Sequence, residues 1–107
     1  MEKLTPSAQQ SKPVYFVVCV HIPDPDNRRD YDEYIRMVKP VVEKAGGRYL
    51  ARSEKVSTMF GGECPDRVII IEFESRSRLE ACFSSAEYQA IKQLRENSVS
   101  SLALIIE

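Results

Sequence analysis

Apolar residues gather in short blocks along the chain, and four of these blocks have the length and composition of β-strands. The first strand is predicted at residues 14–22, VYFVVCVHI, which end at Pro23. A second, irregular strand is predicted at residues 48–60, RYLARSEKVSTMF, and the turn GGECPD joins it to a third, RVIIIEF, at residues 67–73. We expect these two to pair as a hairpin. The last strand is predicted at residues 102–107, LALIIE.

A helical pattern separates the first two strands. Its apolar positions recur every three or four residues, so they form one stripe: Tyr31, Ile35, Val38, Val42 and Ala45. Asp26 or Asn27 is placed to cap the first turn, and Gly46 with Gly47 marks the end. Because a proline cannot donate a backbone hydrogen bond, Pro40 predicts a kink or a restart near residue 40.

The second helical region contains two capping-box patterns, Ser77 with Glu80 and Ser84 with Glu87. We therefore expect two short helices that meet at Ser84 and Ser85. Their apolar side is formed by Leu79, Phe83, Ala86, Ile91 and Leu94.

The predicted order is β-α-β-β-α-β, which is the α+β ferredoxin-like arrangement of a four-stranded antiparallel sheet with two helical segments on one face. The strands VYFVVCV, VIII and LALII are apolar on both faces. A single chain of this length has no element left to cover the second face, so we expect a homodimer formed through the sheet faces. The alternative is a monomer whose amino-terminal segment shields that face.

Composition narrows the class of protein. The chain has 107 residues, enough for one domain, and a formal net charge of −1. The polar composition of residues 1–13 predicts a flexible segment ahead of a domain at 14–107. The balanced charge argues against nucleic acid and anionic membranes as partners, and no apolar run reaches the roughly 18 residues of a membrane span. Three cysteines without motif spacing favour reduced thiols and a cytoplasmic location.

Several stretches together resemble the family known as domain of unknown function 1330. They are GGRYLAR at 46–52, the preceding Tyr31 and Pro40, EFESR at 72–76 and SSAEYQAIKQLR at 84–95. Ser85 is followed by Ala86 where members commonly have proline. The resemblance spans residues 14–107 and implies a dimeric α/β-barrel protein built from ferredoxin-like protomers. That superfamily includes cofactor-independent monooxygenases, enzymes that decompose small molecules, and effector-binding modules, so the resemblance implies no single activity.

Metal and nucleophile chemistry find little support in the sequence. His21 is the single histidine, and the cysteines lack the spacing of a zinc or haem site, so we expect no metal and no cofactor. A site of His21 with carboxylates, or with a nucleophile brought near by folding, stays open. No serine lies in a G-x-S-x-G turn. RNA binding through the sheet would need aromatic residues on the central strand, where RVIIIEF is mostly aliphatic.

Glu72 follows four apolar residues on a central strand, where an unpaired carboxylate would be costly. Arg48 and Arg52 lie four residues apart with Leu50 between them, so regular alternation predicts that they share a face and that either pairs with Glu72. The functional alternative is that Arg48 or Arg52, with tyrosines and Arg95, lines a cleft and fixes an anionic or enol-like small molecule. The candidate ligand-binding residues are Tyr31, Arg48, Arg52, Glu72 and Tyr88.

Two functions follow from these residues. The first is a small-molecule-binding or cofactor-independent enzymatic protein of the dimeric α/β-barrel type. The second is a non-enzymatic dimerisation or protein-interaction module, in which the polar residues pair with one another and leave no cavity. The fold is common to both and does not choose between them.

Overall fold

The computed structural model of the chain describes residues 12–107. Residues 1–11 of the predicted flexible segment lie outside this range. The elements follow one another as β1 (Val14–His21), α2 (Arg29–Lys44), β2 (Arg48–Ser53), β3 (Arg67–Phe73), α3 (Arg76–Ser84), α4 (Ala86–Glu96) and β4 (Ser100–Ile106). The predicted order is confirmed, with the second helical segment divided in two.

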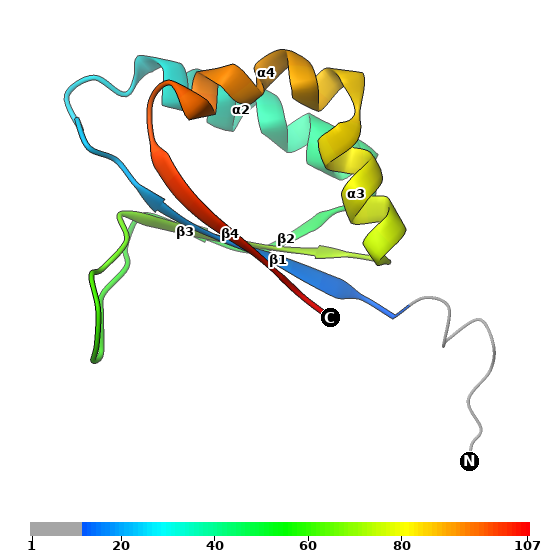
Figure 1. Ribbon diagram of the computed structural model, residues 1–107, viewed down its shortest axis with the longest axis horizontal. Coiled ribbons are helices and arrows are strands. Elements are labelled where there is room, and N and C mark those ends of the chain that lie inside the picture. The colour runs from blue at the N-terminus through cyan, green and yellow to red at the C-terminus, as the bar shows by residue number, and fades with distance from the viewer. Residues whose placement is uncertain (1–11) are drawn as a thin grey trace.

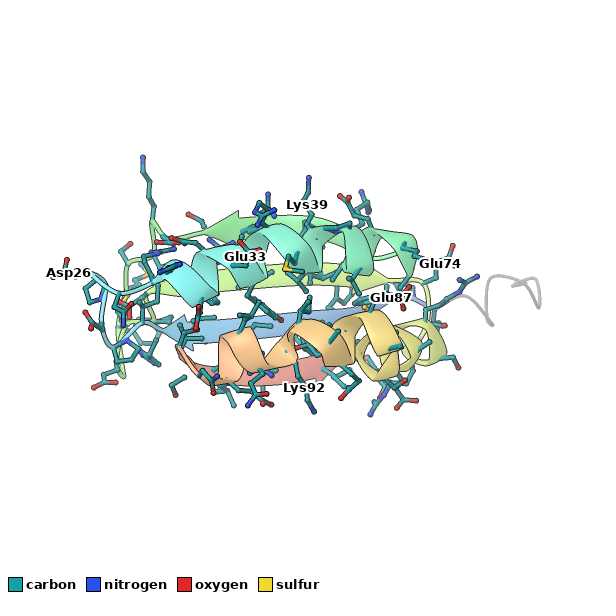
Figure 2. All side chains as sticks on the ribbon, turned by 90° about the horizontal axis from the view of Figure 1, so that it is seen from above. Asp26, Glu33, Lys39, Glu74, Glu87 and Lys92 are labelled. Carbon is teal, nitrogen blue, oxygen red and sulfur yellow. The ribbon has the colours of Figure 1, made fainter. Side chains whose placement is uncertain are left out.

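The four strands form one antiparallel sheet in the order β2-β3-β1-β4. All three helices lie on the same face of this sheet (Figure 1). Seen from the helix side, α2 runs over the half of the sheet that contains β2 and β3, and α4 runs over the half that contains β1 and β4 (Figure 2). The protein is therefore an α+β ferredoxin-like domain, as predicted.

The core fills the space between sheet and helices in two clusters. One surrounds Phe73 and Val42, which are fully buried, and the other surrounds Tyr31 and Val20. The predicted apolar stripe of the first helix faces this core. Large side chains of both layers thus hold the helices on the sheet by removing apolar surface from water.

Of the two alternatives predicted at Pro40, the restart is wrong and the kink stays a prediction, and the predicted caps Asp26 and Asn27 are also wrong. The helix runs from Arg29 to Lys44 as one element with Pro40 inside it. Its cap position is Arg28, and no side chain caps it. Asn27 instead donates its backbone N–H to the carbonyl of Asp24, so these polar residues form a turn ahead of the helix rather than a cap.

The helices α3 and α4 meet at Ser85, close to the predicted junction, but the capping residues are different serines. Ser75 accepts a hydrogen bond from the backbone N–H of Arg78, and Ser85 accepts one from that of Tyr88. Ser85 has the extended backbone that a cap requires. Ser84 remains in the last turn of α3, where its hydroxyl donates to the carbonyl of Glu80. Either Ser84 or Ser85 could cap α4 from the sequence alone, and the extended backbone at Ser85 makes that residue the cap.

The second strand is shorter than predicted and contains a bulge. It ends at Ser53 because the chain turns there, with the Ser53 hydroxyl accepting the N–H of Lys55. Within it, Tyr49 is paired with Ile71 and Ala51 is paired with Ile70, so Leu50 is an extra residue without a partner. A one-residue insertion reverses the alternation of faces beyond it. Arg52, which follows Leu50, therefore points to the face opposite to the one that regular alternation from Arg48 predicts.

The sheet face away from the helices, called the open face below, is mostly apolar. Its residues on β4 are Leu102, Leu104 and Ile106, which are 59%, 46% and 51% exposed. The loop between β2 and β3, residues 54–66, extends away from the helix layer on this side (Figure 1) and carries Met59 and Phe60 at 94% and 87% exposure. Such a concentration of exposed apolar surface is typical of a face that another molecule covers.

Within residues 12–107, none of the helices has the length and apolar character to cross a membrane.

Candidate functional site

A pocket lies between the sheet and the helices and has a volume of about 60 Å³. Its floor consists of helix-facing residues of the central strands, among them Phe16, Val18 and Ile69, and α2 supplies Val38 to its wall. These side chains are aliphatic or phenyl groups. The pocket is large enough for a few water molecules or a ligand of a few heavy atoms, and small compared with the roughly 300–1,000 Å³ of drug-sized sites.

Three arginines also line this pocket: Arg52 from β2, Arg67 from β3 and Arg95 from α4. No aspartate or glutamate is among its lining residues. An arginine beside an apolar cavity needs acceptors for its five N–H groups, since a poorly solvated charge is costly. The arrangement of these arginines therefore determines which molecules the pocket suits.

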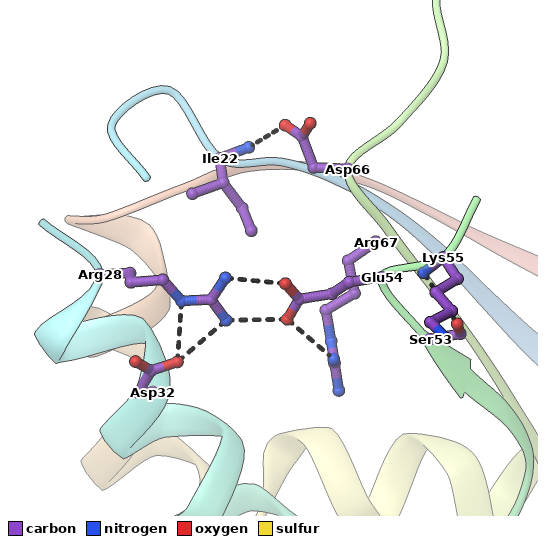
Figure 3. A network of polar contacts seen from close by, with 8 residues as sticks. All are labelled: Ile22, Arg28, Asp32, Ser53, Glu54, Lys55, Asp66 and Arg67. Carbon is purple, nitrogen blue, oxygen red and sulfur yellow. Dashed lines mark hydrogen bonds and ion pairs between the residues drawn. The ribbon is translucent and has the colours of Figure 1, made fainter. Parts of the chain in front are cut away.

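Arg67 is held by an ion-pair network at one end of the pocket (Figure 3). Its Nη1 donates to the carboxylate of Glu54 at 3.2 Å. The same carboxylate accepts two hydrogen bonds of 2.8 Å from Arg28, whose Nε also donates to Asp32 at 3.0 Å. This network connects the start of α2 with the residue after β2 and with the first residue of β3.

The network leaves one group of Arg67 without a partner. Arg67 is only 8% exposed, and its Nε is buried with no hydrogen-bond acceptor. Glu54 is stabilised as an anion, because the hydrogen bonds from Arg28 hold the pKa of its carboxyl below the ordinary value. The charges of Arg28 and Glu54 are thus paired with each other, whereas the buried Nε of Arg67 beside the pocket has no acceptor.

Hydroxyl groups line the pocket on the side of the helices. The phenol oxygens of Tyr34 and Tyr88 lie 3.0 Å apart, and Arg95 Nε donates to the hydroxyl of Tyr88 at 3.3 Å. Burial raises the pKa of Tyr34, and burial likewise raises that of Tyr31. Both phenols are therefore neutral hydrogen-bond donors near pH 7 rather than bases.

Arg52 and Tyr49 form the part of the pocket contributed by β2. The guanidinium carbon of Arg52 lies 5.0 Å from the centre of the Tyr49 ring. Burial raises the pKa of Tyr49 to about 12. Arg52 makes no ion pair with any residue of the described part of the chain, so its charge is not balanced by a carboxylate of this domain.

The predicted site residues separate into two groups. Tyr31 and Arg52 line the pocket, and Tyr88 joins it through the hydroxyl of Tyr34. Arg48 and Glu72 are cross-strand partners on the open face, where Arg48 Nη2 donates to Glu72 at 2.6 Å. The hydroxyl of Tyr15 also donates to Glu72, at 3.3 Å. The prediction that Arg48 and Arg52 share a face is wrong, because the bulge at Leu50 separates them.

Arg67 and Tyr49 line the pocket but were not among the predicted site residues. The signal for Arg67 was available: alternation along β3 places it on the same face as Ile69 and Ile71, opposite to Glu72. The position of Tyr49 in the pocket could be predicted only once the pairing of β2 with β3 was known. No group of three histidine, cysteine, aspartate or glutamate residues within residues 12–107 is arranged to hold a metal ion.

The chain matches a family model in sequence, and solved bacterial proteins share its fold. Residues 13–107 match the family model described as domain of unknown function 1330. A protein of unknown function from Rhodopseudomonas palustris is 22% identical with a TM-score of 0.75, and the match covers 97% of this chain and 93% of that one.

Two further solved structures show the same fold at lower identity. A dimeric ferredoxin-like protein of unknown function from Jannaschia is 11% identical, with a TM-score of 0.70 over 90% of this chain and 99% of that one. A cofactor-independent oxygenase from Streptomyces nogalater is 7% identical, with a TM-score of 0.65 over 89% and 91%. No curated protein matches the chain.

Proposed function

Because the chain belongs to the family described as domain of unknown function 1330, which carries no assigned activity, we propose a function from the pocket: the protein binds a small organic molecule between its sheet and its helices. The observation that supports this most directly is the composition of the pocket lining. Apolar walls surround the cavity, and arginine and tyrosine side chains converge on it from β2, β3, α2 and α4. Ligand sites commonly combine an apolar cavity with a few placed polar groups.

The same polar groups are suited to a reaction without a cofactor. Neutral phenols and guanidinium groups donate hydrogen bonds, and such donors stabilise an oxygen that becomes negatively charged during a reaction, as in enolate formation. The cofactor-independent oxygenase with a similar fold is a reason to include oxygen-dependent turnover of enol-forming compounds in the assays. Its identity of 7% transfers no residue role to this chain.

Filling the pocket tests the proposal. Val38 lines the cavity, whereas its neighbour Met37 is exposed on the same helix. Native mass spectrometry of protein purified from cells, followed by extraction and analysis of small molecules, is expected to detect a compound with wild-type and Met37→Trp protein but not with Val38→Trp protein. Equal contents in all three, together with identical thermal shifts across a compound library, would show that the cavity is only a packing gap.

We further propose that the protein is a homodimer joined through its open faces. The apolar residues of β4 continue across the sheet through Val17 on β1 and Ile70 on β3, and no helix or strand within residues 12–107 covers them. The dimeric state of a structurally similar protein from Jannaschia is consistent with this arrangement. A closed two-fold interface would bury the same patch on both copies.

Analytical ultracentrifugation tests the dimer. Leu104→Asp places a charge among the exposed apolar residues of β4 on the open face, so we expect it to shift the protein to a monomer. Gln93→Asp introduces the same side chain at an exposed position of α4 and is expected to remain dimeric. If the wild-type protein sediments as a monomer, the open face must bind something else. In that case the alternative function, a protein-interaction module, becomes the better explanation of this surface.

A further inference from the structure

The arginines that line the pocket, and Arg28 in the ion-pair network beside it, have a specific charge balance. Arg28 and Arg67 are matched by Asp32 and Glu54, which they contact directly. Arg95 lies 3.8 Å from the carboxylate of Glu96. This leaves Arg52, which has no acidic partner in the described part of the chain. The pocket and its surroundings therefore carry an excess of one positive charge beside apolar walls, and one negative charge would neutralise it.

The buried Nε of Arg67 indicates where an acceptor atom belongs. This nitrogen is shielded from solvent and has no hydrogen-bond partner, although its guanidinium is fixed through Nη1 by Glu54. Leaving a buried donor without an acceptor costs stability, so native structures rarely retain one without a reason. An oxygen of a bound molecule would satisfy it. Because Glu54 and Arg28 hold the side chain in place, the donor is already oriented when the ligand arrives.

The apolar walls limit the kind of anion. A phosphate or sulfate ion loses much hydration on entering a cavity, and it needs many donors in return. Phe16, Val18, Val38 and Ile69 offer none. A carboxylate on a short hydrocarbon body suits the pocket better, because its charged end needs two or three donors and its body packs on these side chains. The volume of about 60 Å³ restricts the body to a few carbon atoms.

We propose that the ligand is a small monocarboxylate, with its carboxylate bound by Arg67 and Arg52 and its short apolar body packed between β1, β3 and α2. This inference rests on the proposed function and specifies the chemical class of its ligand. Arg28 and Glu54 act as positioning residues for Arg67, and Arg52 supplies the charge that the ligand balances.

Matched pairs of probes test the charge requirement. Propionate, isobutyrate and 3-methylbutanoate are each titrated against the wild-type protein by calorimetry, beside propionamide, isobutyramide and 3-methylbutanamide. Each pair has nearly the same shape and differs in charge. We expect at least one acid to bind about tenfold or more tightly than its amide, as the loss of one charge-assisted hydrogen bond predicts. Sodium phosphate and sodium chloride serve as inorganic anions and are expected to bind more weakly than that acid.

Variants test the residues. Arg52→Gln removes the unbalanced charge at an exposed position, and Arg67→Lys keeps a positive charge while removing Nε. Both are expected to reduce the preference for acid over amide to less than about threefold, whereas Arg48→Gln, the same change on the same strand but on the open face, leaves it intact. Circular dichroism of each variant establishes that it is folded. If Arg67→Lys fails to fold, the Arg52→Gln result decides alone.

The inference would be overturned if all three amides bound as tightly as their acids, if the preference survived Arg52→Gln, or if phosphate bound at least as tightly as every acid. An absence of binding by all three acids would do so as well. These outcomes are distinguishable from failure of the proposed function. A neutral molecule retained by wild-type protein and lost from Val38→Trp would leave the pocket a ligand site while excluding the carboxylate.

Discussion

Arg48 and Arg52 lie four residues apart on one strand and point to opposite faces of the sheet. Arg48 pairs with Glu72 on the open face, and Arg52 lies against Tyr49 beside the pocket. The extra residue Leu50 between them causes this difference, because it reverses the alternation of side chains. The strand thereby supplies one arginine to a cross-strand ion pair and the other to the pocket.

This separation predicts a contrast between two double-mutant cycles. Arg48→Ala and Glu72→Ala should show a coupling free energy in unfolding experiments, because the Arg48 guanidinium contacts the Glu72 carboxylate. Arg52→Ala and Glu72→Ala should show none, since the sheet lies between the two side chains. Urea denaturation measures both cycles. Coupling of Arg52 with Glu72 would mean that the bulge is absent in solution.

The two glycines after α2 have different structural roles, and a substitution of Gly47 tests one of them. Gly46 has φ +88, a conformation that glycine adopts without strain. At Gly47, a Cβ would lie 2.5 Å from Val42 Cγ1 and 3.0 Å from the ring of Phe73. We expect Gly47→Ala to lower the free energy of unfolding by about 1–3 kcal/mol through overpacking. In Val42→Ala protein the same substitution should cost less, and an equal cost in both backgrounds would refute a steric cause.

The hydroxyl chain of Tyr34, Tyr88 and Arg95 predicts unequal effects of two similar substitutions. Tyr34→Phe removes one hydrogen bond and should cost about 0.5–1.5 kcal/mol in unfolding free energy. Tyr88→Phe removes the middle member, so Tyr34 loses its partner and Arg95 loses its acceptor. It should therefore cost more. Guanidinium denaturation compares the two, and an equal or smaller cost for Tyr88→Phe would argue against the chain.

The network at Glu54 predicts a dependence of stability on pH. Arg28 lowers the pKa of Glu54 in the folded protein below its ordinary value of 4.5. The ionised carboxyl is thus favoured by folding, and its contribution is fully present above about pH 4.5 and is lost as the pH falls through the lower folded pKa.

The difference in unfolding free energy between wild-type and Glu54→Gln protein measures this contribution. We expect it to be largest near neutral pH and to shrink as the pH approaches about 2. Glu63→Gln, a change on the exposed β2–β3 loop, serves as the control and should show no such trend. A difference that stays constant over this range would mean that the carboxylate charge is not what stabilises the network.

The three cysteines should differ in reactivity. Cys82 is buried, and burial raises the pKa of its thiol to about 11, so it should react with iodoacetamide only after unfolding. Cys64 is exposed and should react first. Cys19 lies half-buried on the open face and should become more reactive in Leu104→Asp protein than in wild type, if dimers cover that face. Peptide mass spectrometry gives the rates, and equal labelling of Cys19 in both proteins would count against the dimer.

Much of the fold could be predicted because each element has a strong periodic pattern. The strand VYFVVCVH and the stripe of Tyr31, Val38 and Val42 each match one regular structure, and their order leaves few arrangements. Cap positions were less predictable, because adjacent serines compete and only the backbone at Ser85 decides between them. Local sequence patterns were therefore sufficient to predict the helices and strands, but not the residues at which each begins and ends.

The site was harder to predict, since it depends on register. Alternation counted from Arg48 places Arg52 on the wrong face, and nothing in RYLAR marks Leu50 as an extra residue. Arg67 begins a strand directly after a loop, so it resembles a solvated end residue until Glu54 and Arg28 are seen beside it. Contacts between segments distant in sequence determine such positions.

The sheet separates the pocket from the open face by the thickness of one backbone layer. Along β1, Phe16 and Val18 face the pocket, while Tyr15 and Val17 face the other side. Under the two proposals made above, neighbouring codons of one strand are subject to different selection pressures, one for ligand preference and one for assembly. Drift in ligand preference can proceed at alternate positions without disturbing the interface, whereas a single inserted codon would exchange the two sets of residues at once.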